Sequence, residues 1–339
     1  MPNPANTLAA ESNSVTTAVL LLNLGTPDSP TPVAVRRYLA QFLSDPRVID
    51  YPRWLWWPIL QGVILPLRPR RSAHAYAKIW TAQGSPLLVH SRALCERVAT
   101  ACPSLRVELA MTYGEPGVPT RVAHLLAAGV RRLLLLPLFP QYSAASTAAA
   151  LDSVFAALRT QRRLPQIRSI VDYHAAPDYI QALAASVEKY WFTHGRGERL
   201  VLSFHGIPER YVRSGDPYHE QCLTTARLLA ARLGIADVAI NVCFQSRVGR
   251  EAWLAPYTDA TLVQLGQDGV RHAQVLCPGF AVDCLETLEE IALRARDQFT
   301  AAGGERLDYI PALNDSASHV QLLCGLIERN TQDWADAGA

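Results

Sequence analysis

Residues 199–222 read RLVLSFHGIPERYVRSGDPYHEQC, and this stretch decides which fold we expect. Its apolar run, 200–204, has the length of a buried strand. Glycine and proline in His205-Gly206-Ile207-Pro208 then end the strand and begin a loop. His205 is therefore expected just past the carboxyl end of a strand, where open α/β sheets bind their ligands. A histidine can accept or release a proton near neutral pH, although a structural histidine at a strand end fits this position equally well.

Strand-like and helix-like segments alternate along the rest of the chain. Apolar runs of strand length lie at 18–24, 107–112, 132–136, 167–173, 200–204, 238–243, 272–277 and 307–310. Segments with a helical pattern lie near 32–43, 85–101, 119–128, 146–160, 217–233, 257–268, 285–302 and 317–330. This alternation predicts βαβ units, and therefore an α/β fold with parallel sheets covered on both faces.

A faint internal repeat divides the chain. Gly129-Val130-Arg131 precedes one apolar strand, and Gly269-Val270-Arg271 precedes another in the second half. We interpret this as two similar lobes facing one cleft, at 18–176 and 177–316, followed by a last helix at 317–334. Chance similarity between two βαβ units is the alternative. Residues 1–17 are small and polar, and are expected to form a disordered tail, not a signal peptide.

Composition excludes several classes of protein. The chain has 339 residues, 49% of them hydrophobic, which suits two domains that each bury a core. The net charge is +2 without a dense stripe of lysine and arginine, which argues against a nucleic-acid partner. The cysteines number seven and form no CxxC pair, so we expect reduced thiols and a cytoplasmic location. No apolar run reaches the length that spans a bilayer.

A row of acids supplies the expected partner for His205. The strand at 272–277 is followed by a turn and then by Glu286 and Glu290, which are four residues apart and share one face of a helix. Imidazole and carboxylate ligands together suit ferrous iron or a neighbouring first-row metal. The alternative for Glu286 is structural, because Asp283 and Glu286 have the spacing of a capping box.

Two further loops leave strand ends on the same predicted edge. Residues 137–143, PLFPQYS, lead into a helix rich in small residues, where a flat ligand could approach the backbone. Residues 243–249, CFQSRVG, form a polar and aromatic loop followed by Trp253. Tight packing at a topological switch and an ordinary βα loop are the alternatives for these two segments, and each loop alone is weak evidence for function.

Taken together, these motifs resemble the ferrochelatase family of haem synthesis, in its bacterial form, from about residue 19 to about residue 330. The carriers are LLLNLGTPDSP at 20–30, QGSPL at 83–87, LFPQYSAAST at 138–147, SFHGIPERYVRSGDPY at 203–218, FQSRVGREAWLAPYTD at 244–259 and PGFAVDCLETLEE at 278–290. The resemblance implies two Rossmann-like lobes, each with a four-stranded parallel sheet, and a last helix that packs back on the first lobe. The implied reaction is a lyase reaction that inserts Fe²⁺ into protoporphyrin IX and yields protohaem and two protons.

The resemblance also implies roles for individual residues. His205 and Glu286 match the iron ligands, and these two with Glu290 match the catalytic groups, Glu290 lying on a metal or proton route. Residues in motifs that line the porphyrin pocket or its mouth are Tyr142, Ser143, Trp253, Ser85, Arg71 and Tyr113. The tryptophan-rich segment 53–67 matches an apolar lip over that mouth.

Three positions depart from the family pattern. Cys284 stands where animal relatives carry a second histidine, and Thr112 stands where many relatives carry arginine. Cys324 is alone near the C-terminus, so we expect no [2Fe-2S] cluster and no permanently bound cofactor, with Fe²⁺ as a substrate.

Alternatives remain open at this point. A related chelatase using coproporphyrin III, sirohydrochlorin or cobalt has the same features, and so does a non-catalytic two-lobed carrier of haem. The segment Trp54–Trp57 suits peripheral contact with a membrane as well as closure over a substrate. We expect a monomer.

Overall fold

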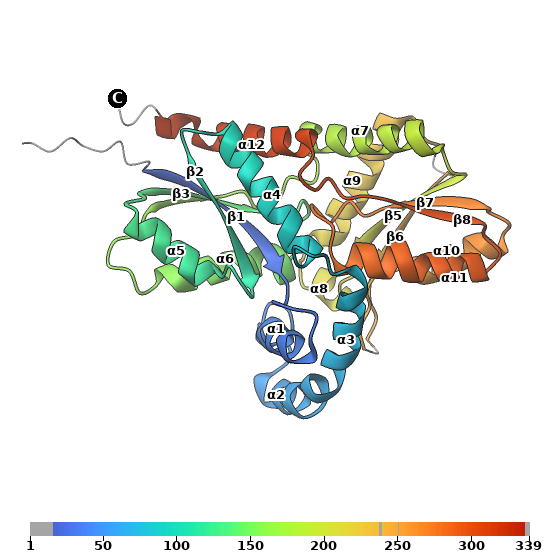
Figure 1. The fold of residues 1–339 in the computed structure, drawn as a ribbon, viewed down its shortest axis with the longest axis horizontal. Helices are drawn as coiled ribbons and strands as arrows, with labels where there is room; N and C mark the ends of the chain where they lie inside the picture. Colours follow the sequence, from blue (N-terminus) through green and yellow to red (C-terminus); the bar gives the residue numbers. More distant parts are fainter. Residues whose placement is uncertain (1–15, 237–238, 250, 336–339) are drawn as a thin grey trace, which may run out of the picture.

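Two parallel sheets form the centre of the molecule, which is described by a computed structural model covering residues 16–236, 239–249 and 251–335 (Figure 1). The first sheet has the order β2-β1-β3-β4 and the second β6-β5-β7-β8, with every pairing parallel. The two-lobed α/β fold predicted from the sequence is therefore confirmed. The predicted tail at 1–17 lies almost wholly outside the described residues.

Each strand of the first sheet has its counterpart in the second. The first sheet contains β1 (Thr17–Gly25), β2 (Arg106–Tyr113), β3 (Arg132–Pro137) and β4 (Gln166–Ser169). The second contains β5 (Arg199–His205), β6 (Ile240–Gln245), β7 (His272–Leu276) and β8 (Arg306–Ile310). β3 and β7 begin at 132 and 272, and β4 and β8 at 166 and 306, so both pairs of strands repeat the spacing of the two Gly-Val-Arg motifs.

Alternate residues of each sheet pack against different helices. Ala18, Leu20 and Leu22 of β1 face the core under α5 (Val118–Ala127) and α6 (Ala149–Leu158). Val19 and Leu21 face the opposite core, which contains residues of α4 (Pro86–Ala101) and α12 (Ala317–Ala335). Both faces of β1 are therefore buried, which explains its uninterrupted apolar sequence.

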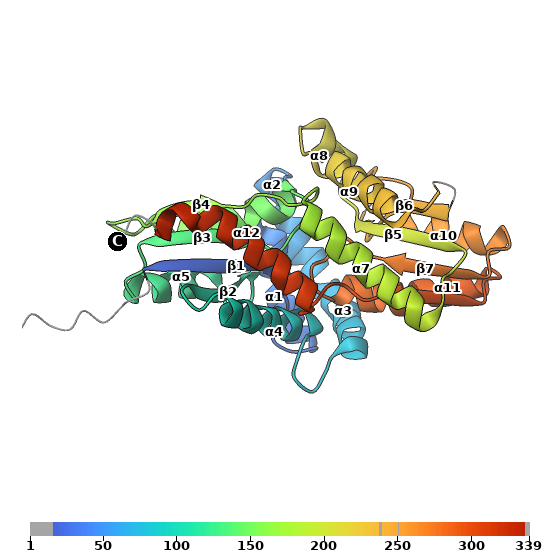
Figure 2. The ribbon, with the colours of Figure 1, turned by 90° about the horizontal axis from the view of Figure 1, so that it is seen from above.

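The second sheet is covered in the same way. One face packs on α10 (Thr258–Gln267), the π-helix η4 (Glu286–Ala295) and α11 (Arg296–Ala301), and the other on α7 (Pro177–His194) and α9 (Tyr218–Leu233). The core that includes Leu21, Leu183 and Leu202 is continuous from one sheet to the other. Figure 2 shows α7 and α12 side by side across both sheets.

The tryptophan-rich segment is helical. It comprises α2 (Arg53–Ile59), the π-helix η1 (Leu60–Ile64) and the start of α3 (Leu65–Ile79), and it packs on α1 (Pro32–Ser44) through Leu60 and Leu65. Figure 1 shows this group projecting away from both sheets. Trp54 and Leu67 remain 78% and 71% exposed, so the segment presents an apolar surface. No helix in the described part of the chain is long and apolar enough to cross a membrane.

The sequence also misplaced some elements. The strand predicted at 167–173 ends at Ser169, and the stretch 176–198, where we placed the lobe boundary, is mostly the helix α7. Two further elements are the short helix α8 (Glu209–Arg213) and the π-helix η2 (Ala144–Ala148), which directly precedes α6.

Candidate functional site

His205 is the last residue of β5, the strand that pairs with both β6 and β7. Its ring is half-buried, and its Nδ1 lies 2.6 Å from the Gly206 carbonyl oxygen. A carbonyl oxygen only accepts hydrogen bonds, so Nδ1 carries the ring proton. The neutral ring therefore keeps its lone pair at Nε2, free to accept a proton or bind a metal ion.

Gly206 sets the path of the chain directly after the histidine. A Cβ at this position would lie 2.9 Å from the Gln245 carbonyl oxygen and 3.3 Å from the Trp253 ring. The Gly206 amide also donates to the Gln245 carbonyl at 2.8 Å. Only glycine therefore lets the end of β5 lie this close to β6 and to Trp253.

Glu286 begins η4 and does not close a capping box. The Asp283 amide donates to Asn314 Oδ1 at 2.8 Å, so it is not the partner of the Glu286 carboxylate. The Cys284 amide donates instead to the Thr287 hydroxyl, which donates in turn to Asp283 Oδ1. The capping-box alternative for Glu286 is therefore wrong, and the Asp283 and Cys284 amides are satisfied without its side chain.

A buried carboxylate fixes the turn before η4. Asp283 is 5% exposed and accepts hydrogen bonds from the Tyr309 hydroxyl, the Thr287 hydroxyl and the Asn314 side-chain amide. These donors come from three segments: η4, β8 and the loop after β8. The start of the helix that carries Glu286 is thus tied to the edge of the sheet.

Glu290 lies in the same electrostatic environment as His205 and Glu286. Burial, followed by the charge of Glu286, raises the pKa of the Glu290 carboxyl. The Ser246 hydroxyl donates to it at 2.5 Å, Arg294 pairs with it at 3.2 Å, and these groups together with His205 oppose the rise. The predicted histidine lies at the end of β5, the two predicted glutamates follow the neighbouring strand β7, and the charges of His205 and Glu286 both act on Glu290.

Ser246 was not singled out from the sequence, although the loop that contains it was. It directly follows β6 and has a φ of 67°, in the left-handed region that non-glycine residues rarely adopt. The hydrogen bond to Glu290 is made from this conformation. Backbone strain of this kind is typically found at functional sites.

The charge of Glu286 also affects two tyrosines on α1 and α3. Tyr38 of α1 and Tyr76 of α3 are buried, and burial, with the charge of Glu286 as a smaller cause, raises the pKa of both hydroxyls. Their helical spacing resembles that of ordinary core residues, so the sequence contained no signal for this proximity.

The loop after β3 is fastened to the second lobe. The Tyr142 amide donates to Gln221 Oε1 at 2.7 Å, and the Ser143 hydroxyl and Ala144 amide donate to Asp216 Oδ2 at 2.9 and 2.8 Å. Ser143 is 3% exposed and caps η2. These contacts give Ser143 a structural task, and its predicted role toward the substrate stays a prediction.

The remaining predicted pocket residues have contacts of their own. Ser85 is buried and accepts from the Thr26 hydroxyl at 2.8 Å, and the Tyr113 hydroxyl donates to Asp45 at 2.8 Å. Arg71 is exposed on α3. Trp253 packs on Gly206, and its indole Nε1 is buried with no partner among the described residues. The predicted roles of these four residues in porphyrin binding stay predictions.

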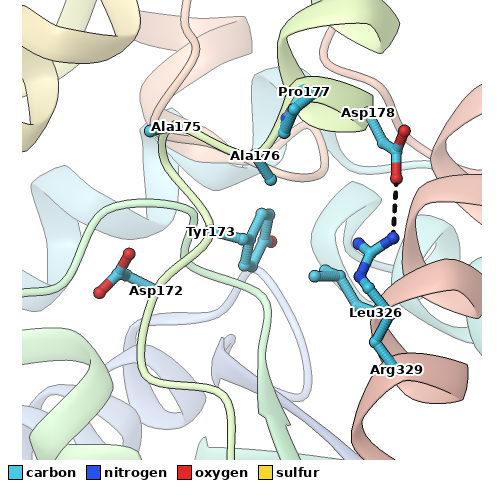
Figure 3. Close-up of a pocket in the computed structure, with 8 residues that line it drawn as sticks. All are labelled: Asp172, Tyr173, Ala175, Ala176, Pro177, Asp178, Leu326 and Arg329. Atoms are coloured by element: carbon cyan, nitrogen blue, oxygen red, sulfur yellow. Dashed lines mark hydrogen bonds and ion pairs between the residues drawn. The ribbon is translucent and has the colours of Figure 1, made fainter.

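Two surface cavities are lined by other residues than His205, Glu286 and Glu290. One, of about 530 Å³, lies between α12 and the segment before α7, where Tyr173, Ala176 and Leu326 line it and Asp178 pairs with Arg329 (Figure 3). The other, of about 360 Å³, borders Glu289, Arg294 and Lys78. Within the described residues, no group of three or more histidines, cysteines or acids is arranged to hold a metal ion.

Comparisons with known proteins give one consistent result. The sequence profile described as ferrochelatase matches residues 16–331. The chain is 51% identical over 324 residues to "Ferrochelatase 1" of Shewanella oneidensis, covering 94% of this chain and 97% of that protein. It is 54% identical over 309 residues to the ferrochelatase of Sodalis glossinidius, covering 91% and 92%.

Solved structures share the fold at low identity. SirB from Bacillus subtilis with Fe³⁺ superposes with a TM-score of 0.54 and 12% identity, covering 92% of this chain and 95% of that one. CbiX, described as the terminal enzyme of sirohaem biosynthesis in denitrifying bacteria, gives 0.52 and 16%, covering 92% and 98%. These structures support the two-lobed architecture alone.

Proposed function

The chain belongs to the ferrochelatase family, and from this premise we propose that His205, at the end of β5, and Glu286 and Glu290, on the π-helix that follows β7, insert ferrous iron into protoporphyrin IX. The products are protohaem and two protons. The observation that supports this assignment is that the charges of His205 and Glu286 both act on the carboxyl of Glu290, although His205 is far from the two glutamates in the sequence.

Metal insertion requires the removal of two protons from a flat ring. Binding energy from the rest of the macrocycle can bend it and tilt the nitrogen lone pairs out of the plane. His205 then accepts a pyrrole proton at Nε2, since Nδ1 is held as a donor to Gly206. Glu290, whose pKa is raised by burial and by Glu286, accepts the proton more readily than an exposed glutamate does.

Iron is a substrate of this reaction and not a resident cofactor. One imidazole nitrogen and one carboxylate suit a first-row divalent ion, and two protein ligands hold it weakly. Weak binding is what transfer into a porphyrin requires. We further propose that the protein binds no [2Fe-2S] cluster, acts as a monomer and works in the cytoplasm.

The direct test is metal insertion by the purified protein. Loss of the free-porphyrin spectrum after Fe²⁺ is added, followed with protoporphyrin IX, coproporphyrin III and sirohydrochlorin and with cobalt in place of iron, identifies the substrates. We expect turnover with Fe²⁺ and protoporphyrin IX. Porphyrin binding without metal insertion would identify a carrier and overturn the proposal.

His205→Ala tests the base. Loss of a general base should lower kcat by roughly 10²–10⁴-fold while porphyrin affinity is retained. His194→Ala, at the exposed end of α7, is the matched control and should leave turnover unchanged. Near-normal turnover by His205→Ala would reject the assignment.

Glu286→Gln tests the facing acid. The substitution keeps the size of the side chain and removes its charge, so it should lower kcat more than it weakens porphyrin binding. The reverse pattern would favour a structural role for Glu286.

The exposed apolar surface of α2 and η1 is the candidate lip. Trp54, Trp57 and Val63 are 78%, 48% and 49% exposed, and basic residues at 68, 70 and 71 follow. We propose that this surface closes over the porphyrin or rests on a membrane. Flotation with anionic liposomes separates the two, because only the membrane contact brings the protein to the top of the gradient.

A further inference from the structure

The seven cysteines include one pair in contact. Cys102 and Cys324 lie 222 positions apart in the sequence, and their sulfur atoms are 3.4 Å apart. Both side chains are half-buried, whereas the other five cysteines are buried. Neither residue belongs to the cluster of His205, Glu286 and Glu290, and neither takes part in the proposed chemistry.

The two thiols join different parts of the fold. Cys102 is the residue that ends α4, and Cys324 lies within α12. Ion pairs already hold α12 in place, among them Arg168 to Asp333 and Asp178 to Arg329. A covalent bond at the thiol pair would add a link between the last helix and the first lobe.

The local geometry allows such a bond. A disulfide needs the sulfurs about 2.05 Å apart, so they must approach by somewhat more than 1 Å. Cys102 has a φ of −119° and a ψ of 62°, outside the helical region, and its side chain is not enclosed within the helix. Side-chain rotation at the end of α4 can therefore supply most of the movement.

We propose that Cys102 and Cys324 form a disulfide under sustained exposure to peroxide, and that this bond locks α12 onto α4. Peroxide oxidises one thiol to a sulfenic acid with release of water. The second thiol then attacks that sulfur, forms the S–S bond and expels a second water, so that two thiols and one hydrogen peroxide give one disulfide and two waters.

The pair rests in the reduced form. Burial, followed by the hydrogen bond with Cys324, raises the pKa of the Cys102 thiol to about 12. Because the thiolate is the form that reacts, Cys102 is a poor nucleophile at neutral pH. Oxidation therefore requires sustained exposure to peroxide and not the ordinary cytoplasmic redox balance.

The test uses the purified full-length protein treated with hydrogen peroxide. We expect the intact mass to fall by two hydrogen atoms, and a non-reduced digest to contain the peptide that joins Cys102 to Cys324. The midpoint of thermal unfolding should rise by a few degrees and return on addition of dithiothreitol, because the bond closes a long loop.

Single variants isolate the pair. Cys102→Ser and Cys324→Ser should each abolish the joined peptide and the thermal shift, and Cys95→Ser, on the same helix α4, should retain both. Metal-insertion activity should be unchanged in the oxidised wild-type protein. Disulfides between other cysteines, disulfides between two copies of the chain, or separate oxidation of the two sulfurs to sulfinic acids would overturn the proposal.

Discussion

The hydrogen bond from Ser246 to Glu290 gives the most specific prediction about the site. The Ser246 hydroxyl donates to Glu290 Oε2 at 2.5 Å, and it lowers a pKa that burial and Glu286 raise. Ser246→Ala removes this donor, so the pKa of Glu290 should rise further. If the ionised carboxylate accepts substrate protons, activity should then be lost at a higher pH than in the wild-type protein.

The size of the effect follows from the surroundings of the carboxylate. A hydrogen bond to a charged group contributes about 1.5–3 kcal/mol. Glu290 is 24% exposed and also pairs with Arg294, which places the loss near the lower limit, at about 1.5 kcal/mol. That loss lowers the ionised fraction about tenfold on the acidic side of the titration.

The assay is the pH dependence of kcat/KM for iron insertion, which reports ionisations of the free enzyme. The acidic limb should move to higher pH, while the plateau at higher pH stays within about twofold of wild type. Ser214→Ala, an exposed serine at the end of α8, is the control and should leave the profile unchanged.

A second variant separates the hydroxyl from the backbone. Ser246→Gly also removes the donor, but it relieves the strain of a φ of 67°. Removing the strain should stabilise the glycine variant by about 1–2 kcal/mol. The entropy that glycine loses on folding offsets part of this gain, so the glycine variant should be up to about 1 kcal/mol more stable than the alanine variant. The acidic limb must move equally in both. A shift in only one of them, or in neither, would refute the reasoning.

Two further predictions concern stability. The raised pKa of Glu290 means that its ionised form is disfavoured by folding, so wild-type stability falls as the pH rises through the folded-state pKa. Glu290→Gln removes this loss, and its advantage in thermal midpoint should grow as the pH rises from the ordinary pKa of glutamate toward the raised folded-state pKa; a constant difference would contradict the pKa shift. Asp283→Ala leaves the donors of Tyr309, Thr287 and Asn314 buried without an acceptor, and should lower the free energy of unfolding in urea by about 3 kcal/mol or more. A loss below about 1 kcal/mol would show that the turn relaxes.

The sequence predicted the architecture because its signals are local or periodic. Buried strands appear as apolar runs, and the constant offset between the two Gly-Val-Arg motifs and the strands after them gave the duplication. The helix α7 was missed although Ile180, Leu183 and Val187 have helical spacing, because the segment lies next to the expected boundary between the lobes. It packs into the core that both sheets share.

The helices α2 and α3 were missed for a different reason. Pro58 and Pro69 lie inside α2 and α3, and proline ordinarily ends a helix because it lacks the amide hydrogen. Here the π-helix η1 lies between the two segments. The turn of a π-helix is wider than that of an α-helix, so each backbone carbonyl accepts from a different amide. The pattern of apolar residues in the sequence does not reveal this change.

The site was predictable as a set of residues but not as a geometry. The strand ends gave His205, and the acidic row gave Glu286 and Glu290. Ser246 could not be assigned, because its hydrogen bond depends on one backbone angle. Glu286 does not cap its helix because the Asn314 side chain accepts the hydrogen bond of the Asp283 amide. Asn314 is distant from Asp283 in the sequence, so no local pattern indicated this.

The two lobes have π-helices at corresponding places, and these helices carry different side chains. Each third strand, β3 and β7, is followed by a loop and then by a π-helix, η2 beginning at Ala144 and η4 beginning at Glu286. The first π-helix reads AASTA and the second ETLEEIALRA, so the same backbone device carries small residues in one lobe and acids in the other. A π-helix is uncommon and is often retained where function requires it. Under the proposed function, the small residues would let a flat ring approach the backbone and the acids would receive its protons, so the two halves of the scaffold would supply binding and chemistry separately.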